Sequence, residues 1–330
     1  MSKYLNLNEI IRFIISYMNL SPIVVFGFNR PNHMNEMLKS LSNNIESKNS
    51  KIIFYIDGFD GKNDENIKKT IEVVKKNWVF GEKIINIREK NYGCKFNIIE
   101  GISEVLSSSK SAIILEDDLI LSKNYLNFIN SSLNKYEAEE KVWSISGWAH
   151  PQLITTRGGS SFSTLTSPWG WGTWSENWDI FIKNKYYEKN LIPGLSKKER
   201  KEFLFYGFAN YWEEAIKKDL EGENSVWDAY WYQAIYLNKG FTLFPNTSHV
   251  QNKGFDGSGL HCKDNDLFFT PLNKTATKFF PKDINVSKNY KFNTFLFFIN
   301  YKRKQYFDYH KEKFSSFSNF KFYLRNKLNR

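Results

Sequence analysis

The chain has 330 residues and a formal net charge of +11, from 46 Lys and Arg against 35 Asp and Glu. Its 41% of hydrophobic and 25% of charged residues are ordinary for a globular protein and exclude a wholly disordered chain. Two cysteines, Cys94 and Cys262, are too few for a disulfide framework or a multi-cysteine zinc site, and they favour a reducing, cytoplasmic setting.

Residues 1–20 are predicted to form a separate amphipathic helix, because the apolar residues between Ile10 and Met18 follow helical spacing. This segment lacks the small-residue cleavage site of a secretory signal. The apolar runs of the chain fall well short of the about 18 residues that a spanning helix needs. We therefore expect a soluble or peripheral protein.

From Ser21 onward, strands and helices alternate. Four short apolar runs are predicted to be buried strands, at 23–28, 52–56, 84–87 and 112–115. Apolar residues at helical spacing lie between them, and Pro31 suits the first turn of the first helix. The pattern predicts an α/β fold with a mostly parallel central sheet and right-handed crossovers.

Ligands of such sheets bind beyond the carboxyl ends of the strands. The polar residues that fall there are Asn29, Arg30, Asp57, Arg88 and the run Glu116-Asp117-Asp118. No GxGxxG follows the first strand and no GxxxxGK[ST] occurs in the chain, which argues against an NAD-type Rossmann domain and a P-loop nucleotidase.

The acidic run Glu116–Asp118 follows a buried strand directly. Three carboxylates there are costly without a cation, and Mg²⁺ or Mn²⁺ held together with substrate phosphates would compensate them. The alternative is a solvated acidic turn in which an Asp caps the next helix.

After Asp118 the composition changes. One more amphipathic helix is predicted around 126–136 and a strand at 142–148, and nine of the ten Trp lie between Trp143 and Trp231. Glycine-rich segments alternate with these aromatics, which suits a half of the domain that contacts a ring-shaped ligand.

These features resemble GT-A nucleotide-sugar glycosyltransferases, above all the Glu-Asp-Asp variant of the N-acetylglucosaminyltransferase I family and its bacterial relatives in surface-polysaccharide gene clusters. The similarity covers about residues 21–265. Besides the acidic run, its segments in chain order are 28–31 (FNRP), 55–58 (YIDG), 88–93 (REKNYG), 143–148 (WSISGW), 168–174 (PWGWGTW), 225–228 (SVWD) and 254–262 (GFDGSGLHC).

The resemblance implies a Rossmann-like nucleotide-binding half fused to an acceptor-binding half. The corresponding division of the chain is an N-terminal helix, 1–20, a donor half, 21–120, an acceptor and catalytic half, 121–265, and a basic aromatic extension, 266–330. It implies a metal-dependent, inverting hexosyl- or N-acetylhexosaminyltransferase, for which we expect a UDP-linked donor. The acceptor would be a glycan or lipid-linked glycan of a bacterial capsule, O-antigen or lipooligosaccharide.

The resemblance also implies roles for single residues. Asp118 would ligate Mn²⁺ or Mg²⁺, completed by His261 or, less favoured, His249. Glu116 and Asp117 would hold the ribose or sugar or orient the waters of the metal. Asn29, Arg30, Asp57 and Arg88 would face the nucleotide. The alternatives are a plain Asp-Gly turn at Asp57, solvated arginines and packed histidines.

Asp228 is the candidate general base, on a predicted helix between Trp227 and Trp231. Partly apolar surroundings would raise its pKa and improve it as a base. A surface helix Asp is the alternative, and Glu213 and Glu214 are weaker competitors. Trp227, with Trp169 and Trp171, could stack on sugar rings, although tryptophans in such number belong mostly to the core.

Two other functions remain open at this stage. A sugar nucleotidyltransferase would use a similar sheet, although the loop after the first strand, GFNRPNH, lacks the usual glycine-rich character. A nucleic-acid-binding protein would use the basic charge and aromatics, but no matching motif occurs.

The positive charge is concentrated at the C-terminus. Residues 281–330 hold 12 Lys and Arg against 3 Asp and Glu, interleaved with aromatic residues. This composition suits the anionic inner leaflet of a membrane, so we expect the protein at the cytoplasmic face of that membrane. We do not expect nucleic acid as a partner. The alternatives are a basic helical cap on the fold and a pairing surface for another chain.

Overall fold

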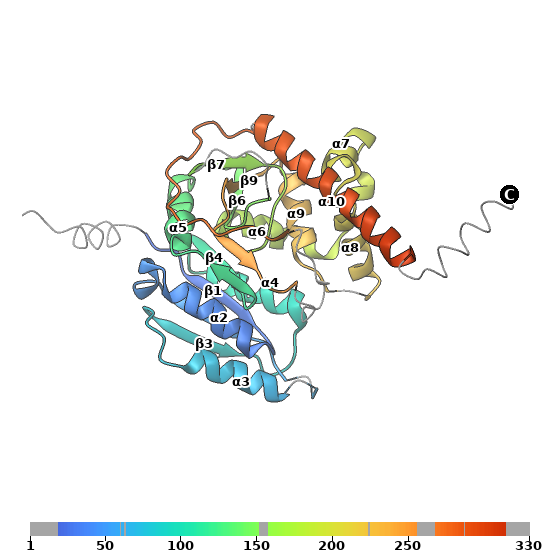
Figure 1. Ribbon diagram of the computed structural model, residues 1–330. Helices are drawn as coiled ribbons and strands as arrows, with labels where there is room; N and C mark the ends of the chain where they lie inside the picture. Colours follow the sequence, from blue (N-terminus) through green and yellow to red (C-terminus); the bar gives the residue numbers. More distant parts are fainter. Residues whose placement is uncertain are drawn as a thin grey trace, which may run out of the picture.

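The computed structural model describes residues 19–59, 61–62, 64–151, 158–223, 225–255, 268–286 and 288–314 (Figure 1). The predicted helix over 1–20 lies outside the described residues except for its last two positions. His261, Cys262 and the end of the basic extension, 315–330, also lie outside them.

The described strands are β1 (Ile23–Gly27), β2 (Ile52–Ile56), β3 (Lys83–Ile87), β4 (Ser111–Glu116), β5 (Leu119–Leu121), β6 (Val142–Ser146), β7 (Ser160–Ser163), β8 (Trp171–Trp174), β9 (Phe241–Pro245) and β10 (Val250–Asn252). The α-helices are α2 (Pro31–Ser42), α3 (Asp64–Lys75), α4 (Gly93–Leu106), α5 (Tyr125–Lys135), α6 (Ser175–Lys183), α7 (Lys197–Phe203), α8 (Tyr211–Leu220), α9 (Asp228–Leu237) and α10 (Lys288–Phe314). Short 3-10 helices are η1 (Ile45–Lys48), η2 (Tyr186–Glu188), η3 (Ile192–Gly194) and η4 (Phe205–Gly207).

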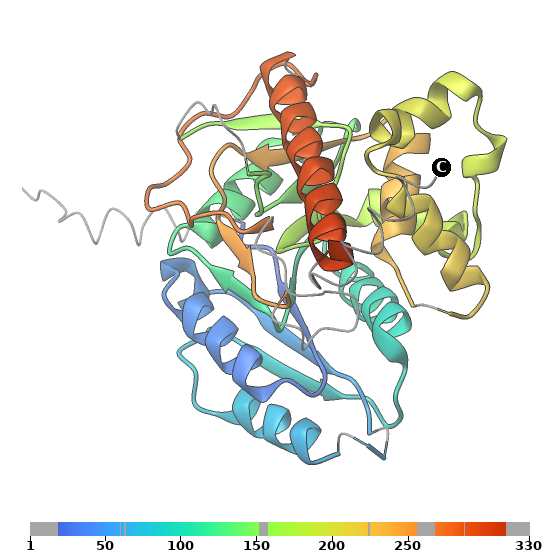
Figure 2. The ribbon, with the colours of Figure 1, turned by 45° about the vertical axis from the view of Figure 1, so that its right-hand side comes forward.

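A central sheet of eight strands runs through the molecule in the order β3-β2-β1-β4-β8-β6-β9-β7. Only β7 and β8 run against the direction of the other six strands. Helices cover both faces of the sheet (Figures 1 and 2). The predicted α/β class with a mostly parallel, helix-flanked sheet is therefore confirmed.

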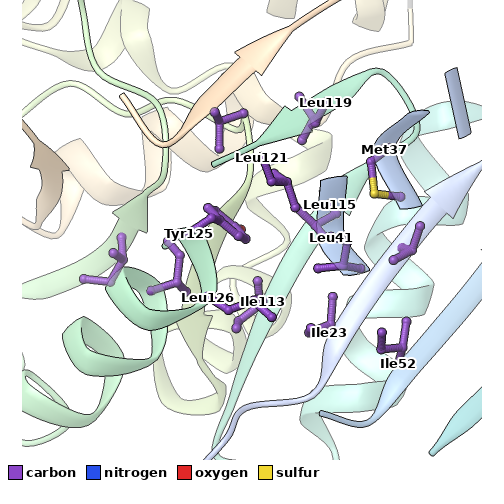
Figure 3. Close-up of a cluster of buried hydrophobic side chains, with 14 of the residues drawn as sticks. Ile23, Met37, Leu41, Ile52, Ile113, Leu115, Leu119, Leu121, Tyr125 and Leu126 are labelled. Atoms are coloured by element: carbon purple, nitrogen blue, oxygen red, sulfur yellow. The ribbon is translucent and has the colours of Figure 1, made fainter. Parts of the chain in front are cut away.

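One face of the sheet packs against α2, α3 and α5. The side chains that meet there are almost wholly apolar and buried, and Figure 3 shows a part of this cluster around Ile113 and Leu115 of β4. Pro31 occupies the first turn of α2 as predicted, where its fixed φ favours the helix and its missing N–H costs nothing.

The opposite face is strongly aromatic. Here α4, α6 and α9 pack on alternate residues of β1, β2 and β4. Trp171, Trp178 and Trp231 are among the largest fully buried side chains of the protein. Most of the tryptophans are thus core residues, which is the role that their number favoured.

The first four predicted strands and their helices are confirmed with shifts of one or two residues. The structure adds elements that no pattern in the sequence indicated, above all the short strands β5 and β10, which pair with each other antiparallel. A strand of three residues is too short for a periodicity to show. In this small sheet, Asn252 lies opposite Leu119, and Leu119 directly follows the acidic run.

Within the C-terminal extension, residues Lys288–Phe314 form one long helix, α10, which lies beside β7 (Figures 1 and 2). Phe297 and Phe298 are 7% and 3% exposed and contact His150, while Phe298 also packs against Phe205. Phe292, on the outer face, is 58% exposed. The extension therefore contributes aromatic side chains to the core.

Among the described residues, the structure contains no helix both long and apolar enough to cross a membrane.

Candidate functional site

The direction of chain winding reverses between β1 and β4. From β1 the chain continues to β2 and β3 on one side, and β4 then returns to pair with β1 on the other side. Helices α2 and α3 cover one face and α4 the opposite face. Such a reversal opens a crevice at the carboxyl ends of the two strands, where doubly wound sheets bind their ligands.

Arg30 and the acidic run meet at this reversal point. The guanidinium of Arg30, which follows β1, donates to Asp117 Oδ1, and its second terminal nitrogen lies 3.1 Å from Asp118 Oδ2. Burial opposes the charge of Arg30, but the neighbouring carboxylates outweigh it and raise the pKa of the guanidinium above its ordinary value. Arg30 thus partly compensates the acidic run.

Compensation by one arginine is incomplete. Burial raises the pKa of Asp117 to about 6 despite the opposing charge of Arg30. Glu116 has no ion pair among the described contacts, and burial together with the charge of Asp118 raises its pKa well above the usual range. Three adjacent carboxyl groups with one cation between them can therefore accept a further positive charge.

Asp228 lies within electrostatic reach of the acidic run, although 110 residues separate it from Asp118 in the sequence. Its charge raises the pKa of Glu116, and it acts on the Cys94 thiol together with all three carboxylates of the run. Tertiary folding thus brings together the residues that the sequence suggested as metal ligand and as base.

Asp228 is the first residue of α9, as the prediction of a helix required. Trp227 and Trp231 are 3% and 1% exposed. Burial raises the pKa of Asp228 to about 6, opposed by backbone hydrogen bonds such as the N–H of Ala229 donating to Oδ1 at 2.9 Å. A carboxylate with such a pKa is ionised at neutral pH and is a stronger proton acceptor than an exposed Asp.

The backbone after β10 closes on the acidic run. The N–H of Lys253 donates to the carbonyl of Asp118 at 2.8 Å. Gly254 approaches the Asp118 carboxylate so closely that a Cβ at this position would collide with Oδ2. Lys253 and Gly254 therefore lie directly against Asp118.

The described residues contain no group of three His, Cys, Asp or Glu side chains arranged to hold a metal ion. Mg²⁺ and Mn²⁺ do not need one, because they accept one or two carboxylates together with substrate phosphates and water. Asp118, 13% exposed at its side chain and flanked by incompletely compensated carboxyls, fits such an ion.

Asp57 has its carboxylate oxygens occupied by backbone donors. Oδ1 accepts the N–H groups of Gly58 and Tyr92, and Oδ2 accepts that of Gly93 at 3.0 Å. Gly93 has a φ of +73°, which glycine adopts without strain. Asp57 therefore holds the start of α4 against the end of β2.

Arg88 turns toward α4. Its guanidinium contacts Asn97 at 3.1 Å and Glu104 at 2.9 Å, and it stacks between the rings of Tyr55 and Tyr92. Asn29, by contrast, is half-buried directly between β1 and Arg30. Of the predicted nucleotide contacts, Arg30 is the one that pairs with the acidic run.

The three tryptophans proposed for sugar stacking differ in exposure. Trp171 and Trp227 are 0% and 3% exposed and stack on each other at 5.4 Å between ring centroids. Trp169 is partly exposed and packs edge-on against Phe255, which follows Gly254. Only Trp169 of the three keeps accessible surface, and it lies beside the segment that contacts Asp118.

His249 is a packed core histidine. It is 0% exposed, its Nδ1 bonds to Ser122 Oγ at 2.7 Å, and its Nε2 bonds to Thr277 Oγ1 at 2.9 Å. The suggestion that His249 contributes to the metal site was therefore wrong, because both ring nitrogens are engaged elsewhere. The weaker base candidate Glu213 pairs with Arg200 at 2.7 Å, and Glu214 pairs with Lys218 at 3.1 Å.

Cys94 lies within electrostatic reach of the acidic run, a neighbour that the sequence did not indicate. It is the second residue of α4, half-buried, and its pKa is raised well above the usual range by burial, then by the charges of Glu116, Asp228 and the rest of the acidic run. The thiol is therefore neutral at physiological pH. Its only signal in the sequence was its position next to Gly93.

Comparison with protein families gives one match. The sequence profile of the KAP family P-loop domain matches residues 2–84, about a quarter of the chain. This stretch contains no GxxxxGK[ST] sequence, and strand β1 is followed by Phe28-Asn29-Arg30 instead of a glycine-rich phosphate loop.

Among solved structures, the chain is similar to S. aureus TarS, with 10% identity over 77% of this chain and 41% of that chain at a TM-score of 0.42. It is also similar to GalNAc-T7 with UDP, GalNAc and Mn²⁺, with 13% identity over 71% and 44% of the two chains at a TM-score of 0.40. A nucleoside-diphosphate-sugar pyrophosphorylase from Vibrio cholerae RC9 matches with 8% identity over 70% and 95% at a TM-score of 0.41. The chain spans less than half the length of the first two structures.

Proposed function

We propose that this protein is a metal-dependent, inverting glycosyltransferase of the GT-A type that uses a nucleoside-diphosphate sugar, with UDP as the expected nucleotide. One observation carries the proposal. The carboxylate run Glu116–Asp118 lies at the reversal point of a doubly wound sheet, and the candidate base, Asp228, is near enough for its charge to raise the pKa of Glu116. This arrangement supplies both requirements of sugar transfer from a diphosphate, a proton acceptor and a place for a charged leaving group.

In the proposed mechanism, Asp118 would hold Mn²⁺ or Mg²⁺, with His261 as a further candidate ligand. The bound ion supplies Lewis-acid stabilisation of the negative charge on the departing nucleoside diphosphate. Arg30, ion-paired with Asp117 and Asp118, lies where it can also contact a phosphate. Glu116 and Asp117 orient the sugar or the waters of the ion.

Asp228 accepts the proton of the acceptor hydroxyl. As the O–H bond breaks, the hydroxyl oxygen forms a bond to the anomeric carbon. The bond from that carbon to the diphosphate oxygen breaks at the same time, and its electron pair leaves with the nucleoside diphosphate. A single displacement of this kind inverts the configuration at the anomeric carbon.

The remaining site residues follow from their positions. Asn29 and Arg30 flank the nucleotide, while Asp57 and Arg88 act on it through the start of α4, which both contact. Trp169 offers a partly exposed ring to the sugar or acceptor. The donor half would correspond to 21–120 and the acceptor half to 121–265.

The acceptor we propose is a glycan or lipid-linked glycan of bacterial surface polysaccharide, reached from the cytoplasmic face of the membrane. Support comes from the outer face of α10, where Lys288, Lys291 and Phe292 are exposed. Basic and aromatic side chains on one exposed face favour an anionic lipid surface. Reversing the charge of Lys288 and Lys291 to Glu should weaken binding to phosphatidylglycerol vesicles, whereas equal binding would refute the membrane contact.

The decisive experiment measures what is released from the donor. The full chain is incubated with Mn²⁺ and a panel of UDP-, GDP- and dTDP-sugars, with and without excess EDTA. We expect slow release of one nucleoside diphosphate, abolished by EDTA and by Asp118→Ala. Release of pyrophosphate from a nucleoside triphosphate and a sugar phosphate would instead identify a nucleotidyltransferase. Full activity in EDTA would remove the metal from the proposal.

A further inference from the structure

A buried ion pair joins the donor side of the molecule to the segment that carries Asp228. Lys95, in the first turn of α4, places Nζ 2.6 Å from Oδ2 of Asp219, near the end of α8. The two side chains are only 9% and 5% exposed. This pair is therefore shielded from solvent, unlike the exposed pair Asp179–Lys183 on α6.

Asp219 uses both carboxylate oxygens. Oδ2 accepts the hydroxyl of Tyr230 at 2.7 Å in addition to Lys95, and Oδ1 accepts the backbone N–H of Val226 at 3.0 Å. The ammonium of Lys95 also lies 4.5 Å from the centroid of the Tyr230 ring. Val226 and Tyr230 each lie two residues from Asp228, so Asp219 holds the chain on both sides of it.

The other end of this network borders the donor site. The N–H of Gly93 donates to Asp57, and the neighbouring Cys94 lies in the field of Glu116, Asp117, Asp118 and Asp228. Lys95 follows directly. The first turn of α4 is thus bound to the end of β2 on one side and to Asp219 on the other.

Stability alone does not explain such a pair. Removing two charges from water costs about as much as their attraction returns, so a buried ion pair adds little to stability relative to apolar residues of similar size. The pair does fix geometry, because a carboxylate that accepts from three donors holds those three groups in one arrangement.

We propose that Asp219, oriented by Lys95, is the positioning residue that sets the location of Asp228 relative to the donor site. The inference rests on the proposed function, because it takes Asp228 to be the base. Asp219 touches no reacting atom in this scheme and acts only through the backbone of Val226 and the hydroxyl of Tyr230. A displacement of a catalytic group by about 1 Å can cost about 100-fold in rate.

The test compares Asp219→Asn with the wild-type protein in Mn²⁺-dependent release of UDP from the donor that the panel identifies. The exchange keeps the shape of the side chain but removes the negative charge that pairs with Lys95. We expect kcat to fall by about 10- to 100-fold, as for a misplaced catalytic group. The KM for the donor and the Kd for UDP with Mn²⁺, measured by calorimetry, should remain within about twofold, because the acidic run and Arg30 are untouched.

Two further variants separate positioning from folding. Tyr230→Phe removes a single hydroxyl of the network and should lower kcat by a smaller factor without changing donor binding. Asp179→Asn breaks the exposed Asp–Lys pair on α6 and should leave all constants unchanged. The acid limb of the pH profile of kcat should shift in Asp219→Asn, because the surroundings of Asp228 change. It should not shift in Asp179→Asn.

The outcomes distinguish a failure of the positioning role of Asp219 from a failure of the assignment of Asp228 as the base. Wild-type kcat in both Asp219→Asn and Tyr230→Phe would overturn the positioning role, as would a loss of kcat matched by an equal loss of UDP binding. If Asp228→Asn turns over its donor at the wild-type rate, the assignment of the base fails instead, and the positioning role fails with it.

Discussion

At the scale of single residues, the surroundings of a carboxyl group decide its chemistry. Asp117 and Asp228 are both aspartates with raised pKa values of about 6, yet one has an arginine beside it and the other has backbone donors and buried tryptophans. The first is arranged to hold positive charge and the second to accept a proton. This difference supports the separate roles that we propose for them.

The pKa of Asp228 leads to a pH prediction. A base must be ionised to act, so the rate of UDP release should fall about tenfold per pH unit below pH 6, where Asp228 takes up a proton. Rates are measured between pH 5 and 8 at saturating donor and Mn²⁺. Asp228→Asn should be at least about 100-fold slower.

Binding of UDP with Mn²⁺ is followed over the same pH range as the control, because Asp117 titrates nearby. A rate that stays constant down to pH 5 while binding is maintained would contradict the assignment of Asp228.

His249 permits a prediction of stability. Burial lowers its pKa to about 3, so the folded protein keeps this imidazole neutral while the unfolded chain protonates it below about pH 6.5. The stability contribution of His249 is therefore complete above pH 6.5 and is lost progressively as the pH falls toward 3. At pH 5 the loss amounts to about 2 kcal/mol.

Urea unfolding at pH 7 and pH 5 measures this loss. His249→Gln cannot be protonated, and it should show a difference in unfolding free energy between the two pH values that is smaller by about 2 kcal/mol. An equal pH dependence in both proteins would show that His249 does not govern it.

At the scale of elements, α10 changes the meaning of the basic C-terminal extension. The sequence placed its aromatics and lysines in one group, whereas the helix separates them by face. Phe298 packs against Phe205 and Phe208, while Phe292 is 58% exposed. Deleting the whole extension would therefore open the core, so surface substitutions are the cleaner test of membrane binding.

A pair of phenylalanines on α10 tests this separation. Phe298→Ala should lower the unfolding free energy by about 3–5 kcal/mol, the usual cost of removing a buried phenylalanine. Phe292→Ala, six residues earlier and exposed, should change it by less than about 0.5 kcal/mol. Urea titrations of the two variants measure the difference, and equal small losses would mean that α10 is not docked as described.

At the scale of the whole molecule, the site draws its residues from adjacent strands in the interior of the central sheet, from a helix and from the segment after the small second sheet. Arg30 and the acidic run come from β1 and β4, whereas Asp228 comes from α9 and Gly254 from the segment after β10. A ligand held among them would connect parts of the chain that are more than 200 residues apart.

Ligand binding should therefore stabilise the entire fold. A nucleotide present at about 100 times its Kd adds about 2.7 kcal/mol to the unfolding free energy, which raises the melting temperature by several degrees. We expect this shift with UDP and Mn²⁺ together, and a much smaller one with UDP in EDTA. The same shift in Asp118→Ala would contradict the proposed diphosphate-bound ion.

The sequence by itself determined the donor-side architecture. The runs at 23–28, 52–56, 84–87 and 112–115 are continuous and apolar because parallel strands are buried on both faces, and that local property is visible in the residue pattern. The same pattern placed Arg30 and Glu116–Asp118 at the carboxyl edge of the sheet, where Arg30 pairs with Asp117 and Asp118.

Only the tertiary structure decided which distant residues join them. The approach of Asp228 to Glu116, the closure of Gly254 on Asp118 and the burial of Lys95 with Asp219 depend on contacts between segments that are far apart in the chain. Lys95 of α4 reaches Asp219 of α8, and Asp219 in turn accepts the hydroxyl of Tyr230 of α9. A local pattern carries no record of such packing, because the energy of each contact depends on both partners at once.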